Sequence, residues 1–382
     1  MRNQLSYPLA HTEMDPVREF WGDFKFDNDK VMLRLGKQQI VWGNTEGVKM
    51  LDIICPTDYR TFTQEPWEES RIAIWAMKLE YFFTQDKTLQ FIFDPDVEPN
   101  FSAPAFSPYQ LEISRLSNGA VKDQIERYIN QTEPRSFSKS NFGFRWKQVM
   151  GDFEYTLNYW NAWTPFPGIW FGGIEPNSKS PLGYTILLDE QYRRRQALGG
   201  SFSKTVNKIG PLENFVLRGE TVLFLKDIGT THVPGNPPGV GLGQNRFNDL
   251  NYALCLDKSW YPLFAPRGLN FEFQYFQTIN FNYHMKDLTF VNPITAGPMD
   301  QYENSASIYL WTDYLHETIQ PEVLFVYETN HSDGYVRPKI SYQISDHWKI
   351  SLIANVYWGN KYTTWGQFNY NDEIGMQLKY GF

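Results

Sequence analysis

The sequence predicts an all-β protein, a transmembrane antiparallel β-barrel of about 14–16 strands with short periplasmic turns and long extracellular loops. Three observations predict this fold. Apolar and polar residues alternate with a period of two along nearly the whole chain. Short and long connections alternate between these segments. The longest apolar runs are about five residues, whereas a membrane helix needs roughly 20. No linker or internal repeat divides residues 1–382, so we expect a single outer-membrane barrel domain.

The alternation defines the expected strands in order. In the last one, every second residue from Ile374 to Phe382 is apolar, and small or polar residues lie between them. A barrel strand needs about 9–11 residues to cross the hydrocarbon, and most segments supply this length. An even count is needed for closure, so about 14 or 16 strands are expected. The expected segments are 18–26, 31–41, 72–83, 88–95, 141–150, 153–163, 185–206, 213–227, 249–258, 269–278, 305–317, 319–331, 333–344, 347–358 and 371–382.

The connections fall into two classes. Short, hairpin-like turns rich in Asp, Asn, Ser and Gly lie at 27–29, 150–152, 330–334 and 345–347. Long connections, several of them rich in Pro and Gly, lie near 42–71, 96–140, 164–184, 229–248 and 279–304. Short turns at one rim and long loops at the other are typical of outer-membrane barrels.

Composition excludes several protein classes. The 43 acidic and 35 basic side chains give a net charge of −8, which argues against nucleic-acid binding. Two cysteines are too few for a disulfide scaffold or a four-thiolate zinc site. The first residues contain no apolar signal-peptide core, so we expect a mature or truncated chain.

A soluble β-sandwich would also alternate, but three features favour lipid around the apolar face. Opposite charges share the polar face of one strand, as in Lys78 with Glu80 and Arg218 with Glu220, and this suits a wet lumen. Aromatic residues cluster at strand ends, where they form girdles at the membrane interfaces. They are Tyr81, Phe83, Phe142, Trp163, Trp348 and Trp358.

The third feature is the C-terminal strand. Its apolar residues end in a terminal Phe, a pattern that resembles the signal by which the barrel-assembly machinery recognises its substrates for insertion. The residues that form this expected insertion signal are Met376, Leu378, Tyr380 and Phe382. We therefore expect a protein of the bacterial outer membrane, in contact with its lipid.

Residues 33–75 resemble a known family. The strand Leu33–Gly43 reads LRLGKQQIVWG, the following loop contains LDIICPTDYR at 51–60, and Glu69-Ser70-Arg71-Ile72 comes next. This pattern resembles the bacterial outer-membrane proteins described as domain of unknown function 1302. Similar stretches recur at 198–202 and 217–220. Two departures are Cys55, where the family pattern has Asn, and Ala73, where Pro is common. The resemblance implies a porin-like barrel that moves hydrophobic or aromatic small molecules with envelope partners.

Alternation also assigns charged side chains to the lumen. The expected pore-lining residues are Arg34, Lys78, Glu80, Arg145, Lys147, Glu154, Arg193, Arg195, Arg218, Glu220, Arg337 and Lys339. With Lys349, Lys379, Glu272, Glu322 and Glu328 included, eleven basic residues face six acidic ones. Such a lumen favours anions, although arginine–glutamate pairs that satisfy one another across strands explain the same pattern.

The connection 42–71 is a candidate pore-constricting loop that folds into the lumen; an outward loop or a periplasmic plug is the alternative. Its charged residues are Asp52, Asp58, Arg60, Glu68 and Glu69. Cys55 in this loop and Cys255 on a predicted lumen face are a possible disulfide pair in an oxidising envelope.

These features favour a passive channel for small anionic or amphipathic solutes, with no metal and no cofactor. No H-E-x-x-H, G-x-S-x-G, P-loop or C-x-x-C-H motif occurs. Two alternatives remain. One is a structural sheath around a periplasmic or surface partner, such as an export complex or an electron-carrying cytochrome. The other is a barrel hydrolase with a Ser–His pair at one rim.

Overall fold

The computed structural model describes residues 17–381, except for 64–65, 96, 104–106, 112–124, 129–136, 179–182, 210–211, 233–241, 282–288 and 292–298. Almost all regular structure in these residues is β-strand. One short helix, α2 (Trp67–Ser70), and the 3₁₀ turns η3 (Phe137–Lys139) and η4 (Gly366–Phe368) are the exceptions. No helix in this part of the chain has the length and apolar character needed to cross a membrane.

The main sheet has sixteen strands, in agreement with the expected 14–16. Neighbours along its path are antiparallel, and β16 (Thr289–Val291) adds to β13 off the path. The path runs through β1 (Phe20–Phe26), β2 (Val31–Gln38), β4 (Ile74–Thr84), β5 (Lys87–Asp94), β8 (Asn141–Met150), β9 (Phe153–Trp163), β12 (Arg194–Ile209), β13 (Leu212–His232), β14 (Leu242–Trp260), β15 (Leu269–Phe281), β17 (Tyr302–Trp311), β18 (Ile319–Glu328), β19 (Asp333–Gln343), β20 (Trp348–Trp358) and β21 (Glu373–Tyr380).

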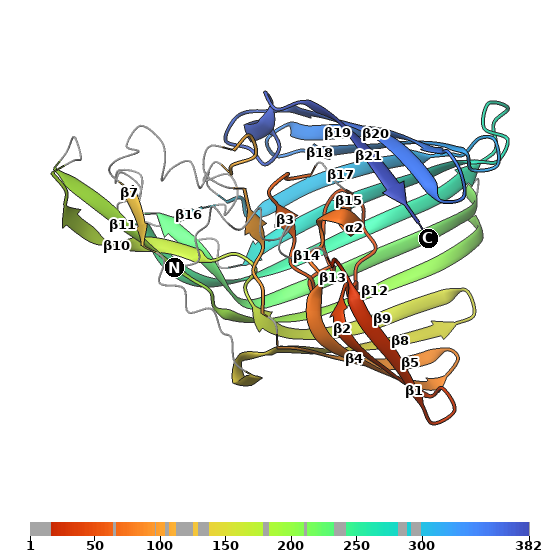
Figure 1. Ribbon diagram of the computed structural model, residues 1–382, viewed down its shortest axis with the longest axis horizontal. Helices are drawn as coiled ribbons and strands as arrows, with labels where there is room; N and C mark the ends of the chain where they lie inside the picture. Colours follow the sequence, from red (N-terminus) through yellow and green to blue (C-terminus); the bar gives the residue numbers. More distant parts are fainter. Residues whose placement is uncertain are drawn as a thin grey trace.

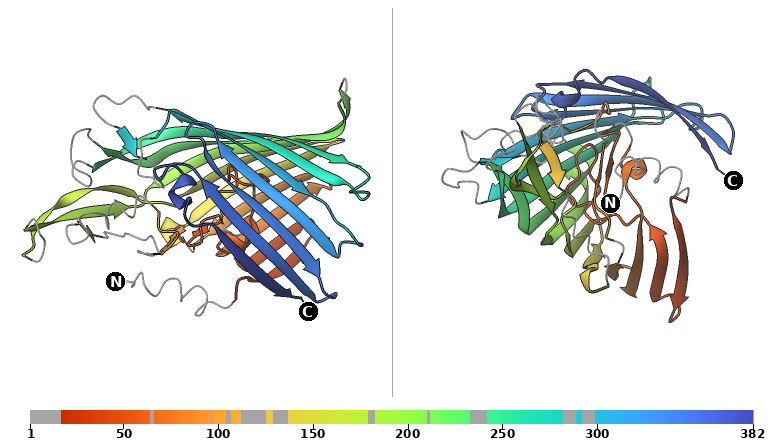
Figure 2. Two further views of the ribbon diagram at one scale, coloured as in Figure 1. Left: turned by 90° about the horizontal axis from the view of Figure 1, so that it is seen from above. Right: turned by 60° about the vertical axis from the view of Figure 1, so that its left-hand side comes forward.

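The sheet curves around a central space, with the N-terminal and C-terminal strands as its two edges (Figures 1 and 2). Connections of two kinds alternate, as the sequence predicts. At one end, which we call the turn end, short links such as Asp27–Lys30 join the strands. Asp27, Asn28 and Asp29 adopt positive φ angles of 51°, 51° and 66°, a region that Asn and Asp tolerate. The opposite end, the loop end, carries the long connections, although the short link 329–332 also lies there.

The expected strand 185–206 is two strands. β11 (Tyr184–Gln191) leaves the main sheet and pairs with β10 (Gly168–Pro176), and β7 (Ile125–Tyr128) joins them. This small sheet projects from the loop end beside β13 and β14 (Figure 1). Gln244 of β14 donates its side-chain amide to the carbonyl of Gly168 at 2.7 Å, which ties the projection to the main sheet.

Alternation places different side chains on the two faces of the wall. The inner faces of β4, β5, β9, β12 and β13 pack against residues of the connection between β2 and β4, including Trp42 and Leu51. The outer face leaves large apolar side chains exposed around the sheet, among them Phe24, Leu35, Trp75, Phe144, Leu157, Leu198, Leu254, Phe325, Leu352 and Met376. A water-soluble protein rarely exposes so continuous an apolar surface, so this face contacts lipid.

Candidate functional site

The candidate site is the connection between β2 and β4, residues 39–73, which we call the lumen segment. Gln38 and Ile74 are paired across these neighbouring strands, so a two-residue turn would be enough to join them. The chain instead runs into the space that the sheet encloses, where it forms β3 (Asp58–Tyr59) and α2 (Figure 1). Its location agrees with the inward loop expected at 42–71; its role in constricting a pore remains a prediction.

Trp42 attaches the segment to the first wall. Its indole N–H donates to the side-chain oxygen of Gln90 on β5 at 2.8 Å. Its ring meets Trp160 of β9 edge to face, with 5.9 Å between the ring centroids. Gly143 lies beside both rings, and a Cβ atom there would come within 3.1 Å of the Trp42 ring. Glycine at this position therefore makes room for the indole.

Glu220 on β13 holds the next part of the segment. Its carboxylate accepts hydrogen bonds from the backbone N–H of Asn44 at 3.0 Å, the hydroxyl of Thr45 at 3.0 Å and the N–H of Leu51 at 3.1 Å. The side chain of Leu51 is fully buried and lies over Gly199, where a Cβ would approach it to 2.5 Å. A buried carboxylate needs several donors, and here the lumen segment supplies them.

The segment then reaches the opposite wall. Gln274 of β15 accepts from the backbone N–H of Glu46 at 3.0 Å and donates to its carbonyl at 3.1 Å. Gly47 follows with φ +84° and lies against Val326 of β18, where a Cβ would come within 2.7 Å. Both the backbone angle and the contact require glycine at this position. Burial raises the pKa of the Glu46 carboxyl.

Ion pairs within the segment fix its fold. Asp52 accepts from Arg71 at 2.7 Å and lies 3.5 Å from the ammonium group of Lys49. Burial lowers the pKa of Lys49, and the charge of Asp52 opposes this shift. Asp58 and Arg60 form a second pair, with a hydrogen bond of 2.8 Å. The segment therefore carries its own neutralising charges into the lumen.

Helix α2 links the two edges of the sheet. Glu69 forms ion pairs with Arg18, which precedes β1, and with Lys379 on β21. The neighbouring Glu68 directs an exposed side chain away, while its carbonyl accepts from Arg18 and from Gln39. Of the predicted loop residues, Glu69 is thus the one that contacts both sheet edges.

Most of the predicted lumen charges are paired across the wall. Lys78 lies 3.1 Å from Glu80, Lys147 lies 2.8 Å from Glu154, and Lys339 lies 3.0 Å from Glu322. Arg34, Arg195 and Arg218 pair with aspartates that the eleven-to-six count leaves out. These aspartates are Asp23, Asp227 and Asp257. Arg218 also pairs with Glu272. The excess of positive charge that the count predicts is therefore largely neutralised.

Three of the expected pore-lining arginines contact the segment. Arg145 donates to the carbonyl of Val41 at 3.3 Å, and Arg337 donates to that of Thr63 at 3.4 Å. Arg218 also donates to the carbonyl of Asn44 at 2.7 Å. The prediction that Arg193 lies on a lumen-facing strand is wrong. Arg193 is exposed in the link between β11 and β12, because the expected strand is broken at this point.

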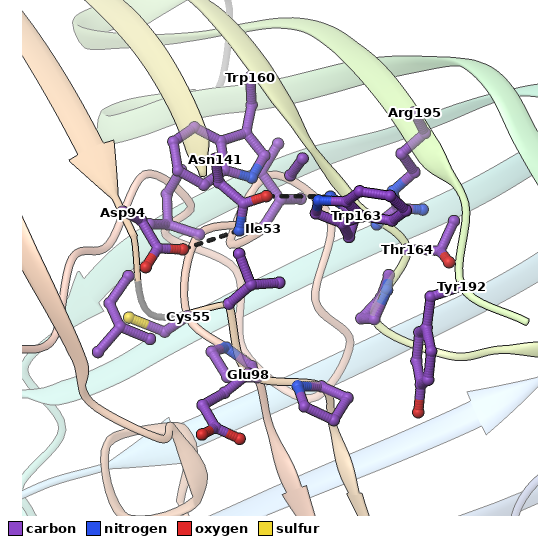
Figure 3. Close-up of a pocket in the computed structure, with 17 residues that line it drawn as sticks. Ile53, Cys55, Asp94, Glu98, Asn141, Trp160, Trp163, Thr164, Tyr192 and Arg195 are labelled. Atoms are coloured by element: carbon purple, nitrogen blue, oxygen red, sulfur yellow. Dashed lines mark hydrogen bonds between the residues drawn. The ribbon is translucent and has the colours of Figure 1, made fainter. Parts of the chain in front are cut away.

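Two pockets are lined by residues of both the segment and the wall. The loop-end pocket encloses about 650 Å³ of empty space, part of it open to solvent. Its walls combine aromatic and apolar groups with a few polar ones, including Trp160, Trp163, Tyr192, Arg195, Asn141 and Thr164, and Cys55 belongs to its lining (Figure 3). Asn141 bridges Asp94 and the backbone N–H of Trp163, at 2.8 and 3.1 Å.

The turn-end pocket is smaller, about 330 Å³. It is bounded by Asn44 and Thr45 of the segment and by wall residues that include Glu154, Arg218, Glu220 and Cys255. Segment residues therefore line both pockets, one near the loop end of the strands and one nearer the turn end.

The possible disulfide between Cys55 and Cys255 does not form. Both are free and buried, and they belong to separate apolar clusters. Cys55 lies 3.2 Å from the backbone N–H of Ile40, and burial raises its pKa to about 12, so the thiol stays protonated. Cys255 contacts Gln274 on the next strand at 3.6 Å.

The predicted insertion signal lies on the lipid-facing side of β21, where Met376, Leu378 and Tyr380 are exposed. Phe382 lies outside the described residues, and the recognition role remains a prediction. Among the described residues, no cluster of three potential metal ligands occurs.

Sequence comparison identifies the family. A model described as a protein of unknown function, DUF1302, matches residues 20–227, more than half of the chain. The chain belongs to the DUF1302 family. The apolar outer face and the strand-built wall make this DUF1302 protein a β-barrel protein of the bacterial outer membrane.

Two solved structures are similar in fold. The P. putida toluene transporter TodX has 11% identity and a TM-score of 0.34, with 75% of this chain and 76% of that chain covered. The outer membrane phospholipase A from Escherichia coli has 11% identity and a TM-score of 0.25, with 64% and 79% covered. No curated protein sequence matches the chain.

Proposed function

We propose that this DUF1302 protein is an outer-membrane channel for small amphipathic solutes, with the lumen segment as its gate. One observation carries the proposal: residues of the segment line both a pocket near the loop end of the strands and a pocket nearer their turn end. Its polar contacts with the wall include hydrogen bonds to single side chains, such as Gln90, Glu220 and Gln274. Such contacts can be exchanged for water when the segment moves.

The lining of the loop-end pocket supports an amphipathic solute. Trp160, Trp163 and Tyr192 provide apolar faces, while Asn141 and Thr164 provide polar groups. Because Arg195 is already paired with Asp227, the pocket offers little net positive charge. We therefore expect weak discrimination by charge and stronger discrimination by apolar content.

The sheath alternative is less well supported. A structural sheath would keep its lumen free for a partner protein, whereas here the chain's own residues occupy it, including Leu51 packed against β12 and β13 and Met50 packed against β14 and β15. The hydrolase alternative needs a histidine ring bonded to a serine hydroxyl. The rings of His331 and His347 bond instead to Glu328 and to the carbonyl of Gly381.

Solute uptake into liposomes tests the proposal. Purified protein should speed the entry of small amphipathic solutes over polar solutes of the same size, with similar rates for anionic and neutral members of the series. Tyr192→Ala should slow the amphipathic solutes and leave small polar ones unchanged. Lys147→Gln, which alters a charge pair outside the loop-end pocket, is the control. Equal rates for all solutes, or entry no faster than in empty liposomes, would contradict the proposal.

A further inference from the structure

Asn158 is a buried residue whose side-chain amide has no partner. It lies on the inner face of β9, and only 5% of its surface is exposed. Neither its Nδ2 nor its Oδ1 forms a hydrogen bond in the part of the chain that the structure describes. Buried polar groups are nearly always paired, because an unpaired group loses its bonds to water without replacement. An amide with both ends unpaired therefore indicates a missing partner.

Arg145 lies directly opposite Asn158 on the neighbouring strand β8. Side chains of such a pair start about 5 Å apart at their Cβ atoms. The hydrogen bond from Arg145 to the lumen segment is long, 3.3 Å to the carbonyl of Val41. Its Nε is buried and has no partner among the described residues. Two donors and one acceptor without partners thus lie on adjacent strands, and we call them the Asn158–Arg145 site.

The charges around this site are already balanced. No carboxylate of the described residues forms an ion pair with Arg145, and Glu80, Glu154 and Glu220 attract it from a longer distance. Glu80 and Glu154 are each paired with a lysine, and Glu220 accepts from N–H groups of the lumen segment. The three carboxylates balance Arg145 and the two lysines. A further buried charge would be costly, so the site suits an uncharged group.

Along β9 the site lies between the linings of the two pockets. Trp160, two residues toward the loop end, lines the loop-end pocket (Figure 3). Glu154, four residues toward the turn end, lines the turn-end pocket. Two residues of a strand span about 7 Å, so a small molecule can contact Trp160 and Asn158 together.

The lumen segment covers the site. Val41 accepts from Arg145, and Leu51 packs over Gly199, the residue of β12 that pairs with Asn158. A solute that moves along this part of the wall would therefore reach the unpaired groups once the segment is displaced.

We propose that Arg145 and Asn158 bind the hydroxyl group of a neutral amphipathic solute, an alcohol or a phenol, as it passes the lumen segment. This inference rests on the proposed channel function and names its solute class. A hydroxyl matches the unpaired groups, because its oxygen accepts from Arg145 Nε and Asn158 Nδ2 while it donates to Asn158 Oδ1. A carboxylate would leave Oδ1 unpaired, and a hydrocarbon would leave all three groups unpaired. The apolar part of the solute would lie toward Trp160.

Equilibrium dialysis of the full chain in detergent micelles tests the proposal, with protein-free micelles as the blank. The probes are 4-ethylphenol, 4-ethyltoluene, which carries a methyl group in place of the hydroxyl, and the anion 4-ethylbenzoate. The wild-type protein should bind 4-ethylphenol at least roughly tenfold more tightly than 4-ethyltoluene, since a site built for a hydroxyl rejects the analogue that lacks it.

Asn158→Leu removes the amide at similar volume. It should reduce the ratio of the two affinities to about one and leave the affinity for 4-ethyltoluene unchanged. Asn161→Leu is the matched control, because it is the same substitution on the outer face of β9 and should keep the wild-type ratio.

The possible results separate this inference from the channel function. A ratio near one in the wild-type protein, or an unchanged ratio in Asn158→Leu, would overturn the inference and leave the channel function standing. Tighter binding of 4-ethylbenzoate than of 4-ethylphenol would assign the site to an anion and overturn the hydroxyl assignment. No binding of any probe would overturn both.

Stability gives a second readout. If the amide of Asn158 has no partner in the closed protein, Asn158→Leu should raise the unfolding midpoint, because leucine buries no polar group. A lower midpoint would show that a bound water already satisfies the amide, and this would overturn the argument for a missing partner. Arg145→Met is a second binding variant, which should also lose the preference for 4-ethylphenol; an unchanged preference would contradict the role of Arg145.

Discussion

At the scale of single residues, Glu220 has the clearest role. Three donors of the lumen segment converge on its carboxylate, and no basic side chain of the described residues forms an ion pair with it. Arg218, two residues earlier on the same inner face, instead pairs with Asp257 and contacts the segment through Asn44. Glu220 therefore binds the lumen segment rather than a neighbouring side chain of the wall.

Replacement of this carboxylate should open the channel. In the Glu220→Gln variant, an amide NH2 group replaces one of the two carboxylate oxygens. This group is a donor and would face the donors of the lumen segment. A hydrogen bond to a charged acceptor contributes about 1.5–3 kcal/mol, and about 1.4 kcal/mol is a tenfold change in an equilibrium. We expect the open fraction in single-channel recordings to rise at least roughly tenfold. Glu322→Gln, which alters a wall pair only, should leave it unchanged. Equal open fractions in both variants would argue against a gating role for Glu220.

Glu69 predicts a dependence on pH. Burial raises its pKa, but the hydrogen bond from Lys379 and the charge of Arg18 outweigh burial, so the pKa lies below the ordinary 4.5. A carboxyl group of this kind stabilises the fold above its unfolded pKa and loses that effect as the pH falls through its folded pKa. Each pair contributes about 1 kcal/mol or less, because Arg18 and Lys379 are half exposed.

The measurement compares the unfolding midpoints of wild type and Glu69→Gln. Their difference should be constant from about pH 8 to about pH 5, should shrink as the pH falls below the ordinary glutamate pKa of 4.5, and should vanish only below the lowered pKa of folded Glu69. Glu68→Gln, on the same helix but with an exposed side chain, should match wild type throughout. A difference that persists unchanged in acid would rule out the ion pairs as its cause.

At the scale of elements, the lumen segment is held by packing as well as by polar contacts. Leu51 is fully buried between the segment and the inner faces of β12 and β13. Because its contacts join the segment to the wall, a cavity there loosens the segment without removing any strand pairing. A substitution can therefore weaken the attachment of the lumen segment without weakening the strand pairing of the sheet.

Leu51→Ala should reduce the free energy that stabilises the packing between the lumen segment and the wall by about 2–5 kcal/mol. The segment should then be cleaved faster by a protease added to the folded protein, while the strands remain protected. Leu157→Ala is the matched control, since Leu157 faces lipid with 60% of its side chain exposed. Cleavage of the segment at the same rate in both variants would contradict the packing argument.

The sequence predicts these elements to different degrees. Alternation locates the strands and the inward face of residues such as Arg218 and Glu220, because side-chain direction follows the period of two. It does not locate Asp227, the partner of Arg195. A register shift between Phe224 and Asp227, with Lys226 at φ +60°, brings both side chains inward despite their odd spacing. The break at Arg193 is equally invisible, since β11 keeps the strand pattern while it pairs outside the main sheet.

The wall residues that bind the lumen segment cannot be identified from the alternation of apolar and polar residues alone. Gln90 and Gln274 are ordinary polar residues in the sequence, and they become anchors only because the lumen segment passes them. Their cross-strand neighbours and the path of the segment depend on register and on long-range packing. The inward faces of strands on either side of a long connection are where such anchors should be sought.

At the scale of the whole molecule, our proposal gives the wall and the lumen segment separate tasks. The curved sheet presents apolar side chains to lipid and paired charges to the lumen, and residues of the lumen segment line a pocket toward each end of the strands. If the segment is what keeps the pore closed, its removal alone should turn the protein into an open pore.

Conductance of a variant that lacks the segment tests this claim most directly. Because Gln38 pairs with Ile74, an Asn-Gly turn can replace residues 39–73 without disturbing β2 or β4. In planar bilayers the wild-type protein should show brief, small openings, and the variant a large and steady conductance with weak ion selectivity. A folded variant that conducts no more than wild type would contradict the account, because the lumen segment would then not be what closes the pore.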